Sequence, residues 1–167
     1  MSVRTGACIE VRVCAVPVQP VLDLVRRDPN LIVHVLHQLL GWELEQPTRG
    51  LLGDAADTQL RARGREWSAD LAIELRRLDG TSTWLALVAP AARDDDERAL
   101  LWPCYAALLG VRRGGPAGLL AIVPAADDLE WARQTTSCGF GALTFTPVAV
   151  TLAQVYALRD QLAAARR

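Results

Sequence analysis

Two segments of strand length on either side of an Asp79-Gly80 dipeptide constrain the fold of this chain more than any other feature of its sequence. Residues 69–78 and 83–89 are each long enough for a strand, and Asp-Gly is typical of tight hairpin turns. The second segment, TWLALVA, is almost entirely apolar, as is usual for an interior strand buried on both faces. The two segments therefore predict a β-hairpin inside a sheet.

Other segments predict further strands. Residues 7–16 alternate between apolar and polar side chains, which is the period of a half-buried strand. We expect this strand either to join a sheet edge or to pair with its copy in a homodimer. Residues 118–123, GLLAIV, indicate another buried strand. Residues 142–150 indicate a last strand that Pro147 interrupts, which places it at an edge or bends it.

The segments around these strands predict helices. Residues 21–27 and 31–40 form two short helices separated at Pro29, because the residue before a proline avoids the helical conformation. A helix over residues 94–109 is expected to bend at Pro103, and its acidic first turn is interpreted as helix capping. Two more helices are expected at residues 127–134 and 151–166.

Taken in order, these elements predict an α/β fold, a three-layer α/β/α sandwich with a central mixed β-sheet. The 167 residues, 51% of them hydrophobic, suffice for one domain with a sizeable core. We assign residues 1–20 to an N-terminal strand extension, residues 21–150 to the core and residues 151–167 to a C-terminal helix. Residues 43–58 are polar and contain Pro47 and two glycines, so they are interpreted as a loop.

The amino-acid composition excludes several catalytic mechanisms and kinds of partner. All 18 basic residues are arginine, so every mechanism that needs a lysine is excluded. The formal net charge of −1 gives no overall attraction to nucleic acid. The sequence shows neither a secretory signal nor an apolar run of membrane-spanning length, so we expect a cytoplasmic protein that does not enter a membrane.

Two small groups of residues are candidates for binding. Arg61, Arg63 and Arg65 recur at a period of two, which would place three guanidinium groups on one face of an extended segment. They would contact nucleic-acid phosphates or form a charged strand edge that keeps the protein soluble. His34 and His37 are the only histidines, and they suit either a metal or proton-transfer pair or ordinary positions on a helix.

Cysteines and tryptophans are less specific. Cys8, Cys14, Cys104 and Cys138 lack the paired spacing of a zinc site and are interpreted as reduced thiols. Cys138 lies in a glycine-containing SCGFG stretch that could present it in a loop, but a nucleophile would also need a lowered pKa and a nearby base. The five tryptophans could line a pocket or an interface, although most are expected in the core.

Two short motifs carry a resemblance to a known superfamily. Ser68-Ala69-Asp70 opens the first strand of the hairpin, and Trp102-Pro103-Cys104-Tyr105 follows in the next helix, ahead of the strand GLLAIVP. This combination resembles the PD-(D/E)XK nuclease superfamily, and within it the small transposase-like, Rpn-type bacterial proteins. The resemblance covers roughly residues 20–150 and implies a restriction-endonuclease-like core.

The resemblance also implies an active site that this chain lacks in part. In the superfamily two carboxylates on adjacent strands hold a divalent metal, and a nearby lysine or glutamine positions water. Asp70 matches the first carboxylate. The other two groups are expected near Ala89 and Ala91, which offer no ligand atoms. Asp70 is therefore a vestigial catalytic residue candidate that lacks the expected partner groups. No metal or other cofactor is expected.

Three functions follow from these observations. The first is a catalytically degenerate protein that acts by binding, as an accessory or regulatory protein with a protein or small-molecule partner. The second is a nuclease that uses Mg²⁺ with a carboxylate relocated to residues 94–96. The third is an enzyme acting on a small metabolite through Cys104, Cys138 or the histidines. Fold alone does not choose among them.

Overall fold

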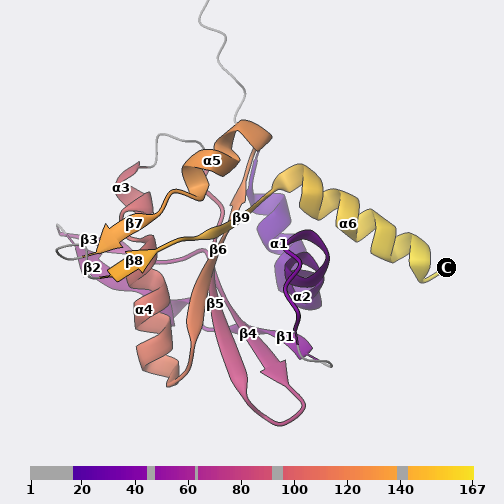
Figure 1. Ribbon diagram of the computed structural model, residues 1–167, viewed down its shortest axis with the longest axis horizontal. Coiled ribbons are helices and arrows are strands. Elements are labelled where there is room, and N and C mark those ends of the chain that lie inside the picture. The colour runs from indigo at the N-terminus through magenta and orange to yellow at the C-terminus, as the bar shows by residue number, and fades with distance from the viewer. Residues whose placement is uncertain (1–16, 45–47, 63, 92–95, 139–142) are drawn as a thin grey trace, which may run out of the picture.

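The protein is described by a computed structural model over residues 17–44, 48–62, 64–91, 96–138 and 143–167. The strand expected at residues 7–16 lies outside these residues. The central sheet has five strands in the order β1-β4-β5-β6-β9 (Figure 1). The strands are β1 (Thr48–Gly53), β4 (Leu71–Arg77), β5 (Ser82–Val88), β6 (Ala117–Val123) and β9 (Val148–Thr151).

The sheet is mixed. Strand β4 pairs antiparallel with β1 and with β5. Strand β6 pairs parallel with β5 and with β9. The hairpin predicted around Asp79-Gly80 is confirmed as β4 and β5, and Gly80 has a φ of 84°, which the turn requires and which glycine adopts without strain. The side chains of β5 are buried on both faces of the sheet, with Leu85 and Leu87 in one core and Ala86 and Val88 in the other, as its apolar sequence predicted.

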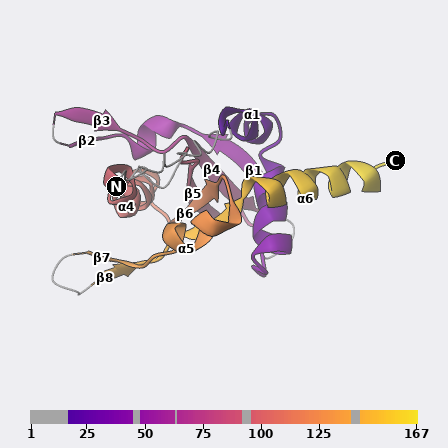
Figure 2. The same ribbon diagram turned by 90° about the horizontal axis from the view of Figure 1, so that it is seen from above.

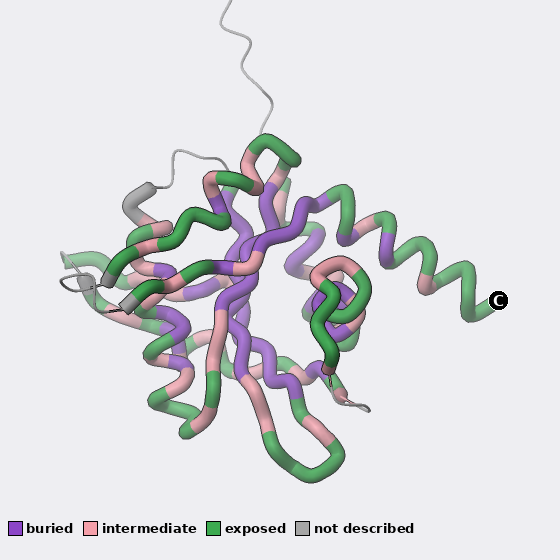
Figure 3. The backbone as a smooth tube through the Cα atoms, in the orientation of Figure 1, coloured by how far each residue is buried: buried purple, intermediate pink, exposed green. Residues whose placement is uncertain are grey.

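Helices cover both faces of the sheet. On one face lie α1 (Gln19–Arg27), α2 (Asn30–His34), the π-helical turn η1 (Val35–Leu39) and α6 (Leu152–Ala165). On the other lie α3 (Asp96–Ala99), α4 (Trp102–Arg113), the 3-10 turn η3 (Ala126–Asp128) and α5 (Leu129–Ala132). Figure 3 shows the buried residues concentrated in the strands between these layers. The predicted three-layer α/β/α sandwich is confirmed.

Two small hairpins stand outside the central sheet. One pairs β2 (Leu60–Ala62) with β3 (Arg65–Trp67), and the other pairs β7 (Thr136–Cys138) with β8 (Leu143–Phe145). Figure 2 shows both projecting from the same side of the molecule, with α4 between them. Pro147 therefore separates two strands that belong to different sheets, rather than bending one strand.

No helix among the described residues is both long and apolar enough to cross a membrane.

The loop interpretation of residues 43–58 was wrong. This segment contains the edge strand β1 and the 3-10 turn η2 (Ala55–Thr58). Its glycines reflect close packing: a Cβ at Gly50 would overlap the backbone carbonyl of Pro29, and one at Gly53 would lie 2.7 Å from the Trp84 ring. Glycine within a strand often marks such a close approach, which a polarity pattern alone does not distinguish from a loop.

The helix expected over residues 94–109 is also different. It consists of two helices, α3 and α4, and Pro103 lies in the first turn of α4 instead of bending a continuous helix. Proline is well accommodated there because the first backbone N–H groups of a helix have no partner within it. Residues 92–95, which include Asp94 and Asp95, lie outside the described part of the chain. The final helix begins as predicted, with Thr151 and Gln154 forming a capping box.

Candidate functional site at the ends of strands β4 and β5

Asp70 lies immediately before β4, where its carboxylate is fully engaged by the protein. One oxygen, Oδ2, accepts a hydrogen bond of 2.7 Å from the backbone N–H of Ala89. The other, Oδ1, accepts one of 2.7 Å from Nη2 of Arg98 on α3, and the two side chains are 22% and 20% exposed. Each carboxylate oxygen thus has an N–H donor, and the two donors come from different elements.

Arg98 was not identified from the sequence. It lies 28 residues beyond Asp70, in the helix that follows β5, and its Nη2 also lies 3.4 Å from the backbone carbonyl of Ser68. No spacing rule connects residues so far apart, and an arginine in the first turns of a helix has no distinguishing pattern. An aspartate kept for a structural reason would be expected to pair with an arginine. The packing of α3 against the sheet identifies that arginine as Arg98.

The strand register places Val88, and not Ala89, opposite Asp70. Leu71 pairs with Leu87, so continuing the register places Asp70 opposite Val88, not Ala89. The side chain of Val88 packs on the α4 face of the sheet, whereas that of Ala89 packs in the core on the opposite face. Ala89 therefore meets Asp70 through its backbone N–H alone.

The side chains at the end of β5 supply no ligand atoms. Val88 lies opposite Asp70 and Pro90 follows it two residues later, and both are as apolar as Ala89 and Ala91. Ala91 is exposed beyond the end of β5. Strand pairing, rather than spacing along the chain, fixes which side chains share a face.

The residues present do not fit a divalent metal. Mg²⁺ needs several converging oxygen ligands, and Asp70 offers one carboxylate whose two oxygens already accept hydrogen bonds. Within the described residues, no group of three or more His, Cys, Asp or Glu side chains is placed to hold a metal ion. The side chains of residues 94–96, which a relocated carboxylate would require, lie outside the description.

The expected stripe of three arginines is not present as predicted. Arg61 lies on β2 and Arg65 on β3, and a turn through Gly64, with a φ of 74°, reverses the chain between them. Arg61 pairs with Glu66 while Arg65 pairs with Ala62, so the two arginines lie on opposite faces of the hairpin. Arg63 lies outside the described residues. A period of two predicts a shared face only while the strand continues.

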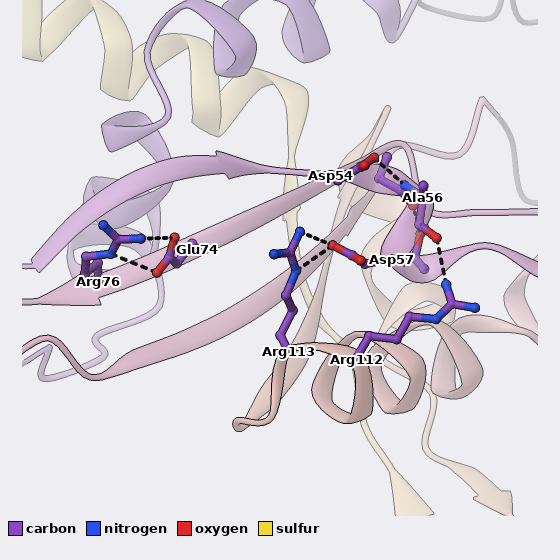
Figure 4. Close-up of polar contacts among 9 residues, drawn as sticks. Asp54, Ala56, Asp57, Glu74, Arg76, Arg112 and Arg113 are labelled. Carbon is purple, nitrogen blue, oxygen red and sulfur yellow. Dashed lines mark hydrogen bonds and ion pairs between the residues drawn. The ribbon is translucent and has the colours of Figure 1, made fainter.

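A second carboxylate, Glu74, lies in the middle of β4 (Figure 4). It is only 8% exposed and receives two hydrogen bonds from Arg76, of 2.9 and 2.8 Å, and one of 2.6 Å from the Ser82 hydroxyl. The hydrogen bonds from Arg76 are the main cause of a lowered pKa for the Glu74 carboxyl, although burial opposes them. Period two along β4 and the hairpin register bring these three residues together.

The end of α4 joins this region to the turn η2. Arg113 forms an ion pair with Asp57, with Nε 2.6 Å from Oδ2, and its guanidinium lies 4.7 Å from the centre of the Trp84 ring. Arg112 donates to the backbone carbonyl of Ala56 at 2.7 Å (Figure 4) and to that of Gln59 at 3.1 Å. These contacts hold η2 against the helix and use the arginines structurally.

The remaining candidates are dispersed. His34 lies on α2 and His37 on η1, with no metal-binding group around them in the described structure. Cys104 is exposed on α4, while Cys8, Cys14 and the side chain of Cys138 lie outside the description. Trp84 and Trp102 are buried, Trp67 and Trp131 are partly buried, and Trp42 is 37% exposed. Trp102 and Trp131 meet, with ring centres 5.5 Å apart.

Comparisons with known proteins add no relative. No protein-family model matches the chain, and neither the curated proteins nor the solved structures give a significant match.

Proposed function

We propose that this chain is a non-nucleolytic binding protein on a nuclease-like frame. The observation that carries the proposal is the state of Asp70, whose two carboxylate oxygens accept hydrogen bonds from Ala89 and Arg98, with no second carboxylate beside it among the side chains that the structure describes. A metal ion would have to displace the Arg98 guanidinium and would then find one anionic ligand in the described part of the site. That arrangement favours a salt bridge over a metal site.

The topology supports the nuclease-like part of the proposal. The order of a helical N-terminal region, an antiparallel hairpin that begins with an acid, a helix and a parallel strand agrees with the order that the resemblance implies. The binding part is supported by a pocket of about 390 Å³ that opens between α3, α4 and α5, on the face of the sheet where Arg98 lies.

A cleavage assay tests the loss of nuclease activity. The purified chain is incubated with supercoiled plasmid, single-stranded DNA and RNA, with Mg²⁺ or Mn²⁺ at about 10 mM, well above the affinity range of ordinary catalytic sites. We expect no cleavage that depends on Asp70, and no Mn²⁺ binding by calorimetry.

Two variants make the assay decisive. Asp70→Asn removes the charge of the candidate residue, and Asp23→Asn is the matched control, because Asp23 is an exposed acid that pairs with Arg26 on α1. Metal-dependent cleavage by the wild type and the Asp23 variant that disappears in the Asp70 variant would overturn the proposal in favour of an active nuclease.

A further inference from the structure

The pocket between α3, α4 and α5 has the composition of a small-molecule site. Its volume of about 390 Å³ falls within the range of about 300–1,000 Å³ that ligand pockets occupy. Trp102 and Trp131 form its aromatic wall, Ala132 lies beside them, and Leu100 is 64% exposed at the chain bend before α4. The polar groups of Gln134 and Thr136 complete the lining.

The two indole rings leave a polar group without a partner. They meet edge to face, with an interplanar angle of 70°. Trp102 is 4% exposed, and its Nε1–H is buried with no hydrogen-bond acceptor among the described residues. An unmade buried hydrogen bond is costly, so a ligand acceptor that reaches this N–H would recover free energy. Because Nε1 is covered in the unliganded protein, its access requires a side-chain adjustment, which is common on binding.

The charges around the pocket favour a neutral ligand. None of the lining residues named for this pocket is charged. The two arginines adjacent to it in sequence are already used by the protein. Arg98 donates to Asp70, and Arg133 donates to the backbone carbonyl of Ala149 at 2.7 Å. An anionic ligand would have to compete with these contacts, whereas an uncharged ring needs only the apolar walls.

We propose that this pocket binds a neutral, planar aromatic small molecule that carries a hydrogen-bond acceptor, with its ring against Trp131 and its acceptor toward Nε1 of Trp102. The inference rests on the proposed binding function and names the class of its ligand. Aromatic rings pack favourably against tryptophan in offset or edge-to-face arrangements, which accounts for the preference for a planar ligand.

The test uses 2-naphthol as the probe and the indole N–H signals of the ¹⁵N-labelled full chain as the readout. The five tryptophans give five signals, which single Trp→Phe variants assign. We expect a saturable shift of the Trp102 and Trp131 signals with a dissociation constant below about 1 mM, with the Trp102 signal moving downfield as its N–H gains an acceptor. 2-Naphthoate, the anionic counterpart, should bind at least about tenfold more weakly.

A matched pair of variants locates the site. Leu100→Arg places a charge at the pocket, where it should weaken 2-naphthol binding about tenfold. Val111→Arg makes the same kind of change at an α4 position that is 81% exposed and outside the pocket, and should leave binding within about twofold. Both positions are exposed enough for the variants to fold.

The inference is overturned if the Trp102 and Trp131 signals do not shift saturably, if 2-naphthoate binds as well as 2-naphthol, or if both arginine variants bind equally. It is also overturned if the strongest shift falls on Trp42, which lines a different pocket. These outcomes are independent of the cleavage assay, since a chain that cuts DNA would refute the proposed function without changing the naphthol titration.

Discussion

Asp70, immediately before strand β4, and Glu74, within it, each form an ion pair with an arginine. The two arginines come from different parts of the chain. At one end Asp70 is bound by Arg98, which comes from α3, and by the backbone of Ala89 on the neighbouring strand. In the middle of the strand Glu74 is bound by Arg76 on its own strand and by Ser82 across the hairpin. The first set depends on the tertiary structure, and the second is complete within the hairpin.

The difference assigns the two acids to different tasks. The Asp70–Arg98 pair, in which each side chain is about one-fifth exposed, ties α3 to the end of the sheet. In the Glu74–Arg76 pair the acid is 10% exposed and the arginine is 53% exposed, so water can solvate the arginine if the acid is lost. Removing Asp70 and removing Glu74 should therefore lower the stability of the protein by unequal amounts.

The largest expected effect is that of Asp70→Ala. This change leaves the Arg98 guanidinium and the Ala89 N–H without their acceptor in a partly buried site, which should lower the free energy of unfolding by about 2–3 kcal/mol. Glu74→Ala should cost less than half as much, because its main partner remains hydrated. Urea unfolding of both variants measures the difference, with Asp23→Ala as an exposed-pair control. Equal losses at Asp70 and Glu74 would contradict the comparison.

A smaller effect should appear on lowering the pH. The pKa of Glu74 is held below its ordinary value of 4.5, chiefly by the hydrogen bonds from Arg76. The unfolded chain therefore binds this proton first, so the stability due to Glu74 is fully present above about pH 4.5 and is lost as the pH falls through the folded-state pKa. The stability difference between wild type and Glu74→Gln should shrink between about pH 5 and pH 3. A constant difference over that range would show that the charge of Glu74 does not contribute.

The smallest effect should be that of salt. Double-mutant cycles on Asp70–Arg98 and on Glu74–Arg76 give one coupling free energy for each pair. Raising NaCl from about 0.1 to 1 M should reduce the Glu74–Arg76 coupling by about half, because the exposed Arg76 is screened, and should change the Asp70–Arg98 coupling less. The reverse order would mean that solvent reaches Asp70 more easily than its exposure indicates.

Much of the central hairpin was predictable because its interactions are local. The two segments of strand length, the Asp79-Gly80 turn and the alternation along β4 bring Glu74, Arg76 and Ser82 together without any distant contact. The capping box at Thr151 is equally local, since a cap and its partner are three residues apart. By contrast, β1 was missed because its glycines are required by close contacts with Pro29 and Trp84. These two residues are distant in sequence from residues 48–53, so the local sequence does not reveal the contacts.

The sequence by itself determined the α/β class of this protein, its central hairpin and the absence of lysine chemistry. These properties depend on composition and on periodicities of two and 3.6 residues. Only the tertiary structure decided that Asp70 pairs with Arg98, that Val88 and not Ala89 lies opposite it, and that Trp102 and Trp131 share a pocket. Each of these depends on how separate elements pack against one another, and neither propensity nor spacing along the chain specifies that packing.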